Sequence, residues 1–179
     1  MNIKFLLRFS PIFLLVLAVF LKLKWEHYSI LMFSAIVLNT ILSYPRKSFY
    51  SFNKYYSVVN YSSWLIFIVT IVFVRSLGFN YEAVAILLLR VFILMLNYFK
   101  FRNFYIPTTF LNLLWAFSFS LYLMELVLNS THGTKSLFML LGIISGIETI
   151  LIIILLKDWR EKISSLLFFL KRNNRMQKQ

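Results

Sequence analysis

Six long apolar stretches follow one another along the chain, and no other feature constrains the fold as strongly. They cover residues 9–22, 28–44, 58–77, 83–99, 108–128 and 136–156. A helix of about 20 apolar residues crosses the hydrocarbon core of a bilayer, and a helix satisfies its own backbone hydrogen bonds there. The sequence therefore predicts an all-α integral membrane protein, a bundle of six transmembrane helices. The second stretch is the weakest, because Asn39, Thr40 and Ser43 interrupt it before Pro45.

The composition supports this class and excludes several others. The 179 residues are 60% hydrophobic and 14% charged, with a mean hydropathy of +0.78. A soluble domain carries about a quarter charged residues, so this chain has too few polar groups to cover a surface in water. The absence of cysteine excludes disulfides, zinc–thiolate sites and thiol catalysis. Because His27, His132 and Asp158 are the only residues of their kinds, we expect no Ser-His-Asp triad, no metal site and no cofactor.

The net charge of +13 is distributed unevenly over the connecting segments. With a cytoplasmic N-terminus, fourteen Lys and Arg residues lie in inside segments, four lie outside and Arg90 lies within a span. The four outside cations are Lys22, Lys24, Arg75 and Lys135. Cytoplasmic segments of membrane proteins carry the excess of cations, so we predict a cell (inner) membrane protein with both termini cytoplasmic. The expected partner of these cations is anionic membrane lipid, not nucleic acid.

The chain is expected to divide into a transmembrane domain, residues 1–156, and a basic cytoplasmic tail, residues 157–179. Cations fill much of a helical wheel of the tail, and one side carries the apolar residues Trp159, Ile163, Leu166, Leu167 and Leu170. This pattern predicts an amphipathic helix in the membrane interface. An ordinary stop-transfer flank is the alternative.

Four ionisable residues lie in or just inside the predicted spans: Arg75, Arg90, Glu125 and Glu148. A charge is costly in lipid, so each is expected to face the bundle and to have a partner. Arg90 is ten residues from Lys100 and Glu148 is nine from Lys157, which places both near mid-membrane at a similar depth. We predict an ion pair between Arg90 and Glu148. For Arg75 and Glu125, near the outer surface, the alternatives are a second ion pair and extension of each side chain to water. A proton-coupled transporter would carry similar charges.

A polar, cationic segment, "SYPRKSFYSFNKYY" at residues 43–56, separates the second and third spans. No Asp or Glu occurs between Glu26 and Glu82. Arg46, Lys47 and Lys54 are therefore candidates for binding the phosphate of an anionic lipid at the cytoplasmic mouth of these spans. A plain cytoplasmic loop is the alternative.

Two apolar segments, "FYIPTTFLNLLWAFSFSLYL" and "GIETILIIILLKDWREKISSL", together with the six-span layout, resemble the CDP-alcohol phosphatidyltransferase family. Thr109 and Asn112 match the last two positions of that family's Lys-x-x-Thr-x-x-Gln helix. The resemblance implies a helical bundle whose signature, D-x-x-D-G-x-x-A-R followed by a Gly and D-x-x-x-D, holds two metal ions. Those ions bridge the CDP-linked diphosphate, and the last acid serves as the base for the attacking alcohol.

This sequence departs from the family at the metal-binding acids. Asn39, Leu42 and Ser43 fall at the first Asp, the second Asp and the Gly, while Lys47 matches the Arg. Tyr56 and Asn60 fall where the final pair of acids would stand. Divalent cations among phosphates need anionic oxygens, so no catalytic residue is expected.

We therefore expect a non-catalytic membrane protein that resembles a phosphatidyltransferase and binds lipid, a partner membrane subunit or a second copy of itself. Three alternatives stay open at this point. They are a substrate-binding subunit of a small-molecule transporter, a small immunity protein, and an active phospholipid-synthesis enzyme with a diverged site.

Overall fold

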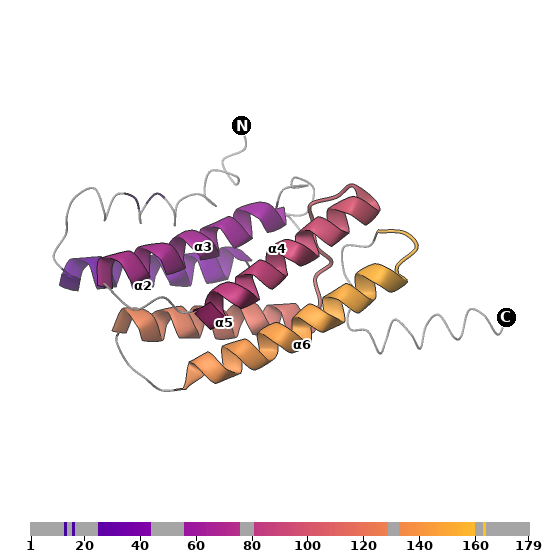
Figure 1. Cartoon of the computed structure of the whole chain (residues 1–179). Coiled ribbons are helices and arrows are strands. Elements are labelled where there is room, and N and C mark those ends of the chain that lie inside the picture. Colours follow the sequence, from indigo (N-terminus) through magenta and orange to yellow (C-terminus); the bar gives the residue numbers. More distant parts are fainter. Residues whose placement is uncertain are drawn as a thin grey trace.

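The computed structural model describes residues 25–43, 56–75, 81–128 and 133–159, together with Phe13, Val16 and Ile163. This part of the chain is helical and contains no strand. Its helices are α2 (Trp25–Ser43), α3 (Tyr56–Arg75), α4 (Tyr81–Phe101), α5 (Phe110–Leu128) and α6 (Thr134–Leu155). They lie side by side along a common direction (Figure 1). The sequence thus predicted an all-α bundle correctly. The first predicted span, 9–22, lies outside the described residues except for Phe13 and Val16, which are helical.

Three of these helices, α4, α5 and α6, are long and apolar enough to cross a membrane. In α2 and α3, the described apolar runs His27–Ile41 and Asn60–Val72 are shorter. Length and composition therefore indicate a membrane protein, with three membrane-crossing helices in the described part of the chain where the sequence predicted six spans in all.

The described bundle combines an apolar outer surface with an interior that contains both apolar and polar side chains. Large apolar side chains such as Ile30, Leu88, Leu140 and Ile154 are exposed. The buried side chains include Asn39, Ser57, Ser63, Arg90, Asn97, Thr109, Ser118, Ser120, Ser145, Glu148 and Thr149. An apolar outer surface is what lipid requires, and polar groups inside such a bundle hydrogen-bond between helices.

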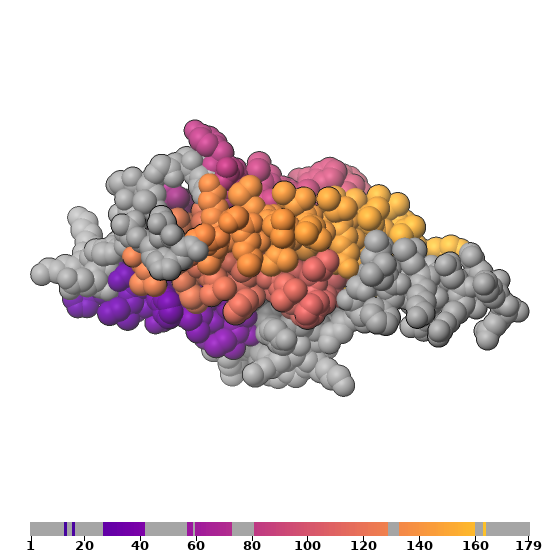
Figure 2. All heavy atoms as spheres, turned by 90° about the horizontal axis from the view of Figure 1, so that it is seen from below, coloured from indigo at the N-terminus to yellow at the C-terminus, as the bar shows by residue number. Residues whose placement is uncertain are grey.

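The centre of the bundle is an aromatic stack contributed by α5 and α6. Trp115 and Phe119 of α5 stack with centroids 5.6 Å apart, and Phe138 of α6 stacks on Phe119 at 4.8 Å and on Tyr122 at 5.2 Å. Trp64 of α3 adds to the stack through Phe119 at 5.1 Å. Figure 2 shows α5 and α6 side by side across one face, with α2 next to α5.

Two glycines of α6 allow α4 to approach closely. A Cβ atom on Gly142 would lie 2.8 Å from Ile86 Cγ2, and one on Gly146 would lie 2.7 Å from Leu89 Cδ2. Small residues at such crossings are typical of membrane helices, which gain stability from close packing because lipid provides no hydrophobic drive between them. The two helices run parallel, since Glu82 and Lys135 pair near their starts and Lys100 contacts α6 near its end.

Near the ends of α4 and α6, a lysine of α4 contacts the last turn of α6. Lys100 Nζ donates to the carbonyl oxygens of Ile153 and Ile154, at 2.9 and 2.8 Å. The last carbonyls of a helix have no partner inside the helix, so this lysine satisfies two of them and interacts favourably with the helix dipole. α4 itself ends at Phe101, and the next residue, Arg102, has φ 53° and an N–H that donates to Tyr98 O at 2.8 Å.

The segment after α6 returns to the loop between α4 and α5. Trp159 Nε1 donates to Tyr105 O at 3.1 Å, and Ile163 N donates to Thr108 O at 3.2 Å. The helix predicted from residue 157 is therefore wrong at Lys157–Trp159 and at Ile163, which are not helical. Backbone pairing with a neighbouring loop replaces helical bonds here. The remainder of the predicted tail lies outside the described residues.

Candidate functional site: a buried arginine cluster and the adjoining polar cavity

Arg90 lies at the centre of the polar interior. It is 0% exposed, and its guanidinium reaches both neighbouring helices. Nη1 donates to Asn112 Oδ1 of α5 at 2.7 Å. Nη2 donates to Ser145 Oγ and to Gly142 O of α6, the latter at 3.4 Å. The guanidinium carbon also lies 4.0 Å from the centroid of the Trp115 ring.

These contacts are all with neutral groups, and together they explain how a cation is tolerated there. Each carbonyl, amide or hydroxyl oxygen directs the negative end of a dipole at the charge, and the indole face adds a cation–π attraction. Charge-assisted hydrogen bonds are about twice as strong as neutral ones. The side chain of Arg90 therefore links the middle of α4 to the first turn of α5 and the middle of α6.

Asn112 connects this cluster to the start of α5. Its Nδ2 donates to Thr149 Oγ1 at 3.1 Å and to Pro107 O at 3.4 Å, so the amide orientation is set from both sides. Its backbone N–H donates to Thr109 Oγ1 at 3.2 Å, which makes Thr109 the N-cap of α5. The Thr-x-x-Asn spacing noted in the sequence is thus the spacing of a helix cap in this fold.

A cavity of about 50 Å³ adjoins the cluster, and we call it the polar cavity. Its polar lining comes from Ser57, Asn60 and Tyr61 of α3, from Thr108 of the loop, and from Asn112 of α5. Trp115, whose ring contacts the Arg90 guanidinium, also lines it. One water needs roughly 10–15 Å³ of such space, so the cavity holds a few waters or one small polar group.

The loop wall of the polar cavity is held by hydrogen bonds to helices. Ile106 N donates to Ser57 Oγ at 3.0 Å, which ties the loop to the first turn of α3. Asn97 Nδ2 donates to Asn103 O and Tyr105 O at 2.7 and 2.9 Å, which ties the same loop to α4. Hydrogen bonds therefore define the cavity, which lies at one end of the bundle where α3, α5 and the loop between α4 and α5 meet.

The structure brings together two of the residues that the family resemblance singled out. Asn60 and Asn112, on different helices, line the same polar cavity. Asn39 is buried in α2 and its Nδ2 makes no hydrogen bond with the described residues, but it is not among the residues that line this cavity. The side chains of Leu42, Ser43 and Tyr56 lie outside the described residues, as do Arg46, Lys47 and Lys54 altogether.

The predicted intramembrane ion pairs have different outcomes. Arg90 and Glu148 are both buried, as expected. The contacts described above for the guanidinium are with neutral groups, and its pairing with Glu148 stays a prediction. Glu125 contacts the start of α6, where its carboxylate accepts from Thr134 Oγ1 and from Thr134 N, the latter at 3.4 Å. The negative charge of that carboxylate stabilises the N-terminus of α6 through the helix dipole. The side chain of Arg75 lies outside the described residues.

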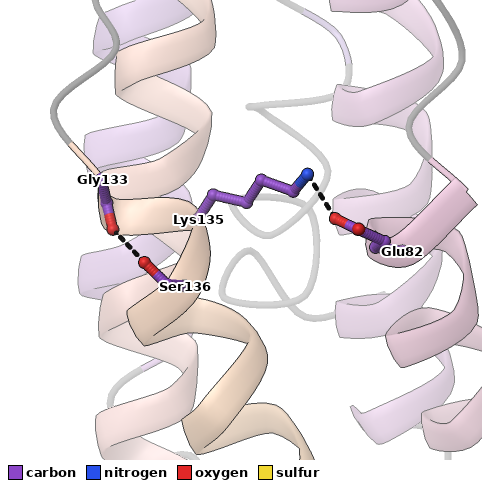
Figure 3. Close-up of polar contacts among 4 residues, drawn as sticks. All are labelled: Glu82, Gly133, Lys135 and Ser136. Atoms are coloured by element: carbon purple, nitrogen blue, oxygen red, sulfur yellow. Dashed lines mark hydrogen bonds and ion pairs between the residues drawn. The ribbon is translucent and has the colours of Figure 1, made fainter.

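Sequence reasoning missed one ion pair and one hydrogen bond at the start of α6. Lys135 Nζ pairs with Glu82 Oε2 between the starts of α6 and α4 (Figure 3). Nearby, Ser136 Oγ donates to Gly133 O at 2.8 Å. The sequence offered one indication of this pair: Glu82 and Lys135 lie at the starts of two helices that run in the same direction. Among the described residues, no three His, Cys, Asp or Glu side chains form a group that could hold a metal ion.

Comparison with known protein families, with curated proteins and with solved structures gives no match for this chain.

Proposed function

We propose that this chain is a non-catalytic, lipid-binding membrane protein that holds the headgroup of an anionic phospholipid in the polar cavity. Its plan resembles that of the CDP-alcohol phosphatidyltransferases, with six transmembrane helices and both termini in the cytoplasm. The observation that carries the proposal is the cavity itself, a space at a bundle end lined by amides and hydroxyls among apolar side chains, whose wall residues Asn112 and Trp115 directly contact the buried Arg90.

The electrostatics of the cavity favour an anion. The described residues that line it include amides and hydroxyls but no carboxylate. Arg90 lies behind this wall, away from water, where its charge is weakly screened. Asn60 supplies an amide that can donate to a phosphate oxygen, whereas Asn112 Nδ2 already donates to Thr149 Oγ1 and Pro107 O. Lys54 precedes Ser57 by three residues in the sequence and is a candidate for a further contact.

The same lining argues against phosphoryl transfer. Transfer from a CDP-linked lipid needs divalent cations, and hard cations among phosphates need carboxylate ligands. Asn60 stands at a position where the resemblance would require an acid. Neutral amides suit binding of a phosphate but not assembly of a two-metal centre. Holding a lipid, without cleaving it, is the chemistry that this set of side chains supports.

The test is a lipid-binding assay on the full chain in mild detergent. Native mass spectrometry would follow adducts of phosphatidylglycerol and phosphatidylcholine with equal acyl chains. Both lipids carry a phosphodiester, but the choline of phosphatidylcholine brings a cation toward Arg90, so we expect phosphatidylglycerol to bind about tenfold more tightly and its binding to weaken as salt rises. Asn60→Leu, which fills the cavity and removes its amide, should abolish the preference. Ser62→Leu, on the exposed side of the same helix, is the matched control and should preserve it.

Equal binding of the two lipids by the wild-type chain would contradict the proposal, as would an unchanged preference in Asn60→Leu. A separate incubation with a CDP-linked lipid, with and without Mg²⁺ or Mn²⁺, measures CMP release. Metal-dependent release would replace the binding function with an enzymatic one.

A further inference from the structure

A second cavity, of about 190 Å³, lies between α2, α3 and α5, and the proposed headgroup site does not use it. We call it the apolar cavity, because hydrocarbon makes up most of its wall. The residues that line it are Thr40 of α2, Trp64 of α3, and Phe110, Leu113, Leu114, Ala116 and Phe117 of α5. An empty apolar space of ~150 Å³ accommodates a benzene ring, so this one has room for a hydrocarbon of about six to eight carbons.

The outer wall of the apolar cavity is a side of α5 that faces away from the bundle. Phe110 and Phe117 are 64% and 56% exposed, and Leu114 between them is also exposed. On a helix apolar enough to cross a membrane, such a side meets lipid. A hydrocarbon ligand can therefore enter this space from the bilayer, and the rest of a longer chain can stay in the lipid.

Two residues of this wall have a polar side-chain atom, but only one of these atoms is available to a ligand. Trp64 is 0% exposed and its Nε1 is buried, so the indole N–H cannot reach into the space. Thr40, in contrast, is half-buried. The polar side-chain atom that a ligand can contact is therefore Thr40 Oγ1.

The hydrogen bond that Thr40 already makes determines which ligand group matches it. Its hydroxyl donates to Ile36 O at 2.8 Å, so Oγ1 has only acceptor capacity left and requires a donor. An ammonium group is unsuitable, because none of the described lining residues is charged. An ionised carboxylate has no proton to donate, and an amide brings a carbonyl that finds no donor in this wall. A neutral hydroxyl on a hydrocarbon fits.

The position of Thr40 along the bundle agrees with a hydroxyl ligand. Thr40 lies three residues before the end of α2, about 4.5 Å along the axis, and Phe110 is the first residue of α5. The polar spot of the cavity is therefore near one end of the bundle. Amphipathic groups at a membrane keep their polar end at the interface and their hydrocarbon in the core. A bilayer alcohol thus carries its hydroxyl at about the level of Thr40.

We propose that the apolar cavity binds a neutral hydrocarbon alcohol from the bilayer, whose hydroxyl donates to Thr40 Oγ1. Its first carbons fill the space between α2, α3 and α5. This inference goes beyond the proposed function, because it concerns a different cavity and a ligand without phosphate. Leu113 and Ala116 line both cavities, so the two sites are neighbours and the experiment has to separate them.

The experiment uses benzyl alcohol and ethylbenzene, which have a hydroxyl and a methyl group at the same place. Equilibrium dialysis of the full chain in mild detergent, against protein-free micelles, measures the affinity for each. The ratio of the two affinities should favour benzyl alcohol about fivefold more in the wild type than in Thr40→Val, the effect of one hydrogen bond. Comparing the ratio between proteins cancels the different partitioning of the two ligands into detergent.

Matched variants separate the hydroxyl from other effects of substitution. Thr70→Val is the control, because Thr70 Oγ1 makes the same kind of bond, to Ile66 O at 2.7 Å, and lines neither cavity. It should keep the wild-type ratio, as should Thr40→Ser, which retains the hydroxyl. Leu114→Trp should fill the space and weaken both ligands, whereas Leu128→Trp, exposed on the same helix and lining neither cavity, should not.

The outcomes separate this site from the headgroup site. Asn60 lines only the polar cavity, so Asn60→Leu should remove the phosphatidylglycerol preference and leave the benzyl alcohol ratio unchanged. An equal ratio in wild type and Thr40→Val, or no saturable binding above that of the micelles, overturns the alcohol site whatever the headgroup result. Concentration-dependent dimerisation that Leu114→Trp abolishes, without any effect on benzyl alcohol binding, would assign the cavity to a second copy and also overturn the inference.

Discussion

Arg90 and Lys135 are both cations on helices that can cross a membrane, yet they are stabilised by different means. Arg90, in the middle of α4, is fully buried and contacts an amide oxygen, a hydroxyl, a carbonyl and an indole ring. Lys135, in the first turn of α6, pairs with Glu82, and the two side chains are 49% and 51% exposed. The contacts described for Arg90 are with neutral dipoles, and the contact described for Lys135 is with an opposite charge.

The difference shows what the surroundings of each region allow. At the exposed end, water screens both charges, so an ion pair forms at little cost and contributes little. In the interior, an ion has lost its hydration and requires several fixed dipoles around it before the helix can bury it. The interior group therefore depends on the packing of three helices, while the end pair depends only on two neighbouring turns.

The largest expected effect is at Arg90. Arg90→Ala would leave a cavity and free the side chains of Asn112 and Ser145 from their shared donor, so we expect the free energy of unfolding to fall by about 3–5 kcal/mol. Arg90→Met, which refills most of the volume without charge, should recover part of the loss. Thermal unfolding in detergent measures both variants.

Glu148→Gln extends the same experiment to the predicted ion pair. If Glu148 is the counter-charge of Arg90, this variant should also lower stability, and its effect should disappear in the Arg90→Met background. An unchanged melting temperature in Glu148→Gln would show that neutral contacts alone hold the arginine. If Arg90→Ala left the melting temperature unchanged, the interior cluster would not stabilise the bundle at all.

An intermediate effect is expected at Thr109. Thr109→Ala removes the hydroxyl that caps α5 and orients the backbone of Asn112, so stability should fall by about 1 kcal/mol. Thr109→Ser retains the acceptor and should restore most of it. Chemical denaturation followed by circular dichroism distinguishes the two. A loss as large in Thr109→Ser as in Thr109→Ala would mean that the methyl group, and not the cap, is responsible.

The smallest effect is expected at the exposed pair. Glu82→Gln should change stability by no more than about 0.5 kcal/mol, and that change should vanish at high salt. The double variant Glu82→Gln with Lys135→Met gives the coupling energy between the two side chains. A coupling as large as that of the interior cluster would contradict the distinction between the two regions.

Much of the fold was predictable because hydropathy alone determines where long helices form in such a chain. The predicted stretches 83–99, 108–128 and 136–156 lie within two residues of the observed ends of α4, α5 and α6. The start of α6 had no side-chain cap to mark it, since Gly133 precedes the helix with φ 87° and the neighbouring Glu125 supplies the acceptor. A contact from another helix leaves no local trace in the sequence.

The contacts of Arg90 were beyond prediction because they depend on a shift of one helical turn. The sequence placed Arg90 and Glu148 at one depth by counting from Lys100 and Lys157. In the structure Lys100 reaches Ile153 and Ile154 instead, about one turn deeper into α6 than Lys157. Because one turn is about 5.4 Å, the guanidinium meets Gly142 and Ser145. Depth was therefore predictable to within a turn, but hydrogen-bond partners require finer precision.

The candidate site was predictable in its residue types but not in its place. Asn60 and Asn112 stood out as amides at positions of interest, yet hydropathy does not report which face of a helix meets which neighbour. The polar cavity arises from the loop 102–109, whose path is set by the side chain of Asn97 and the hydroxyl of Ser57. These are long-range contacts without a periodic signature.

The hydrogen bond from Ile163 N to Thr108 O joins the chain after the last helix to the loop between α4 and α5. Thr108 is part of the wall of the polar cavity, so the position of Ile163 and the shape of that wall depend on each other through one backbone hydrogen bond. Trp159 provides a second attachment, through Tyr105, on the same loop. The described part of the chain after α6 is thus attached at two points to the loop that forms one wall of the polar cavity.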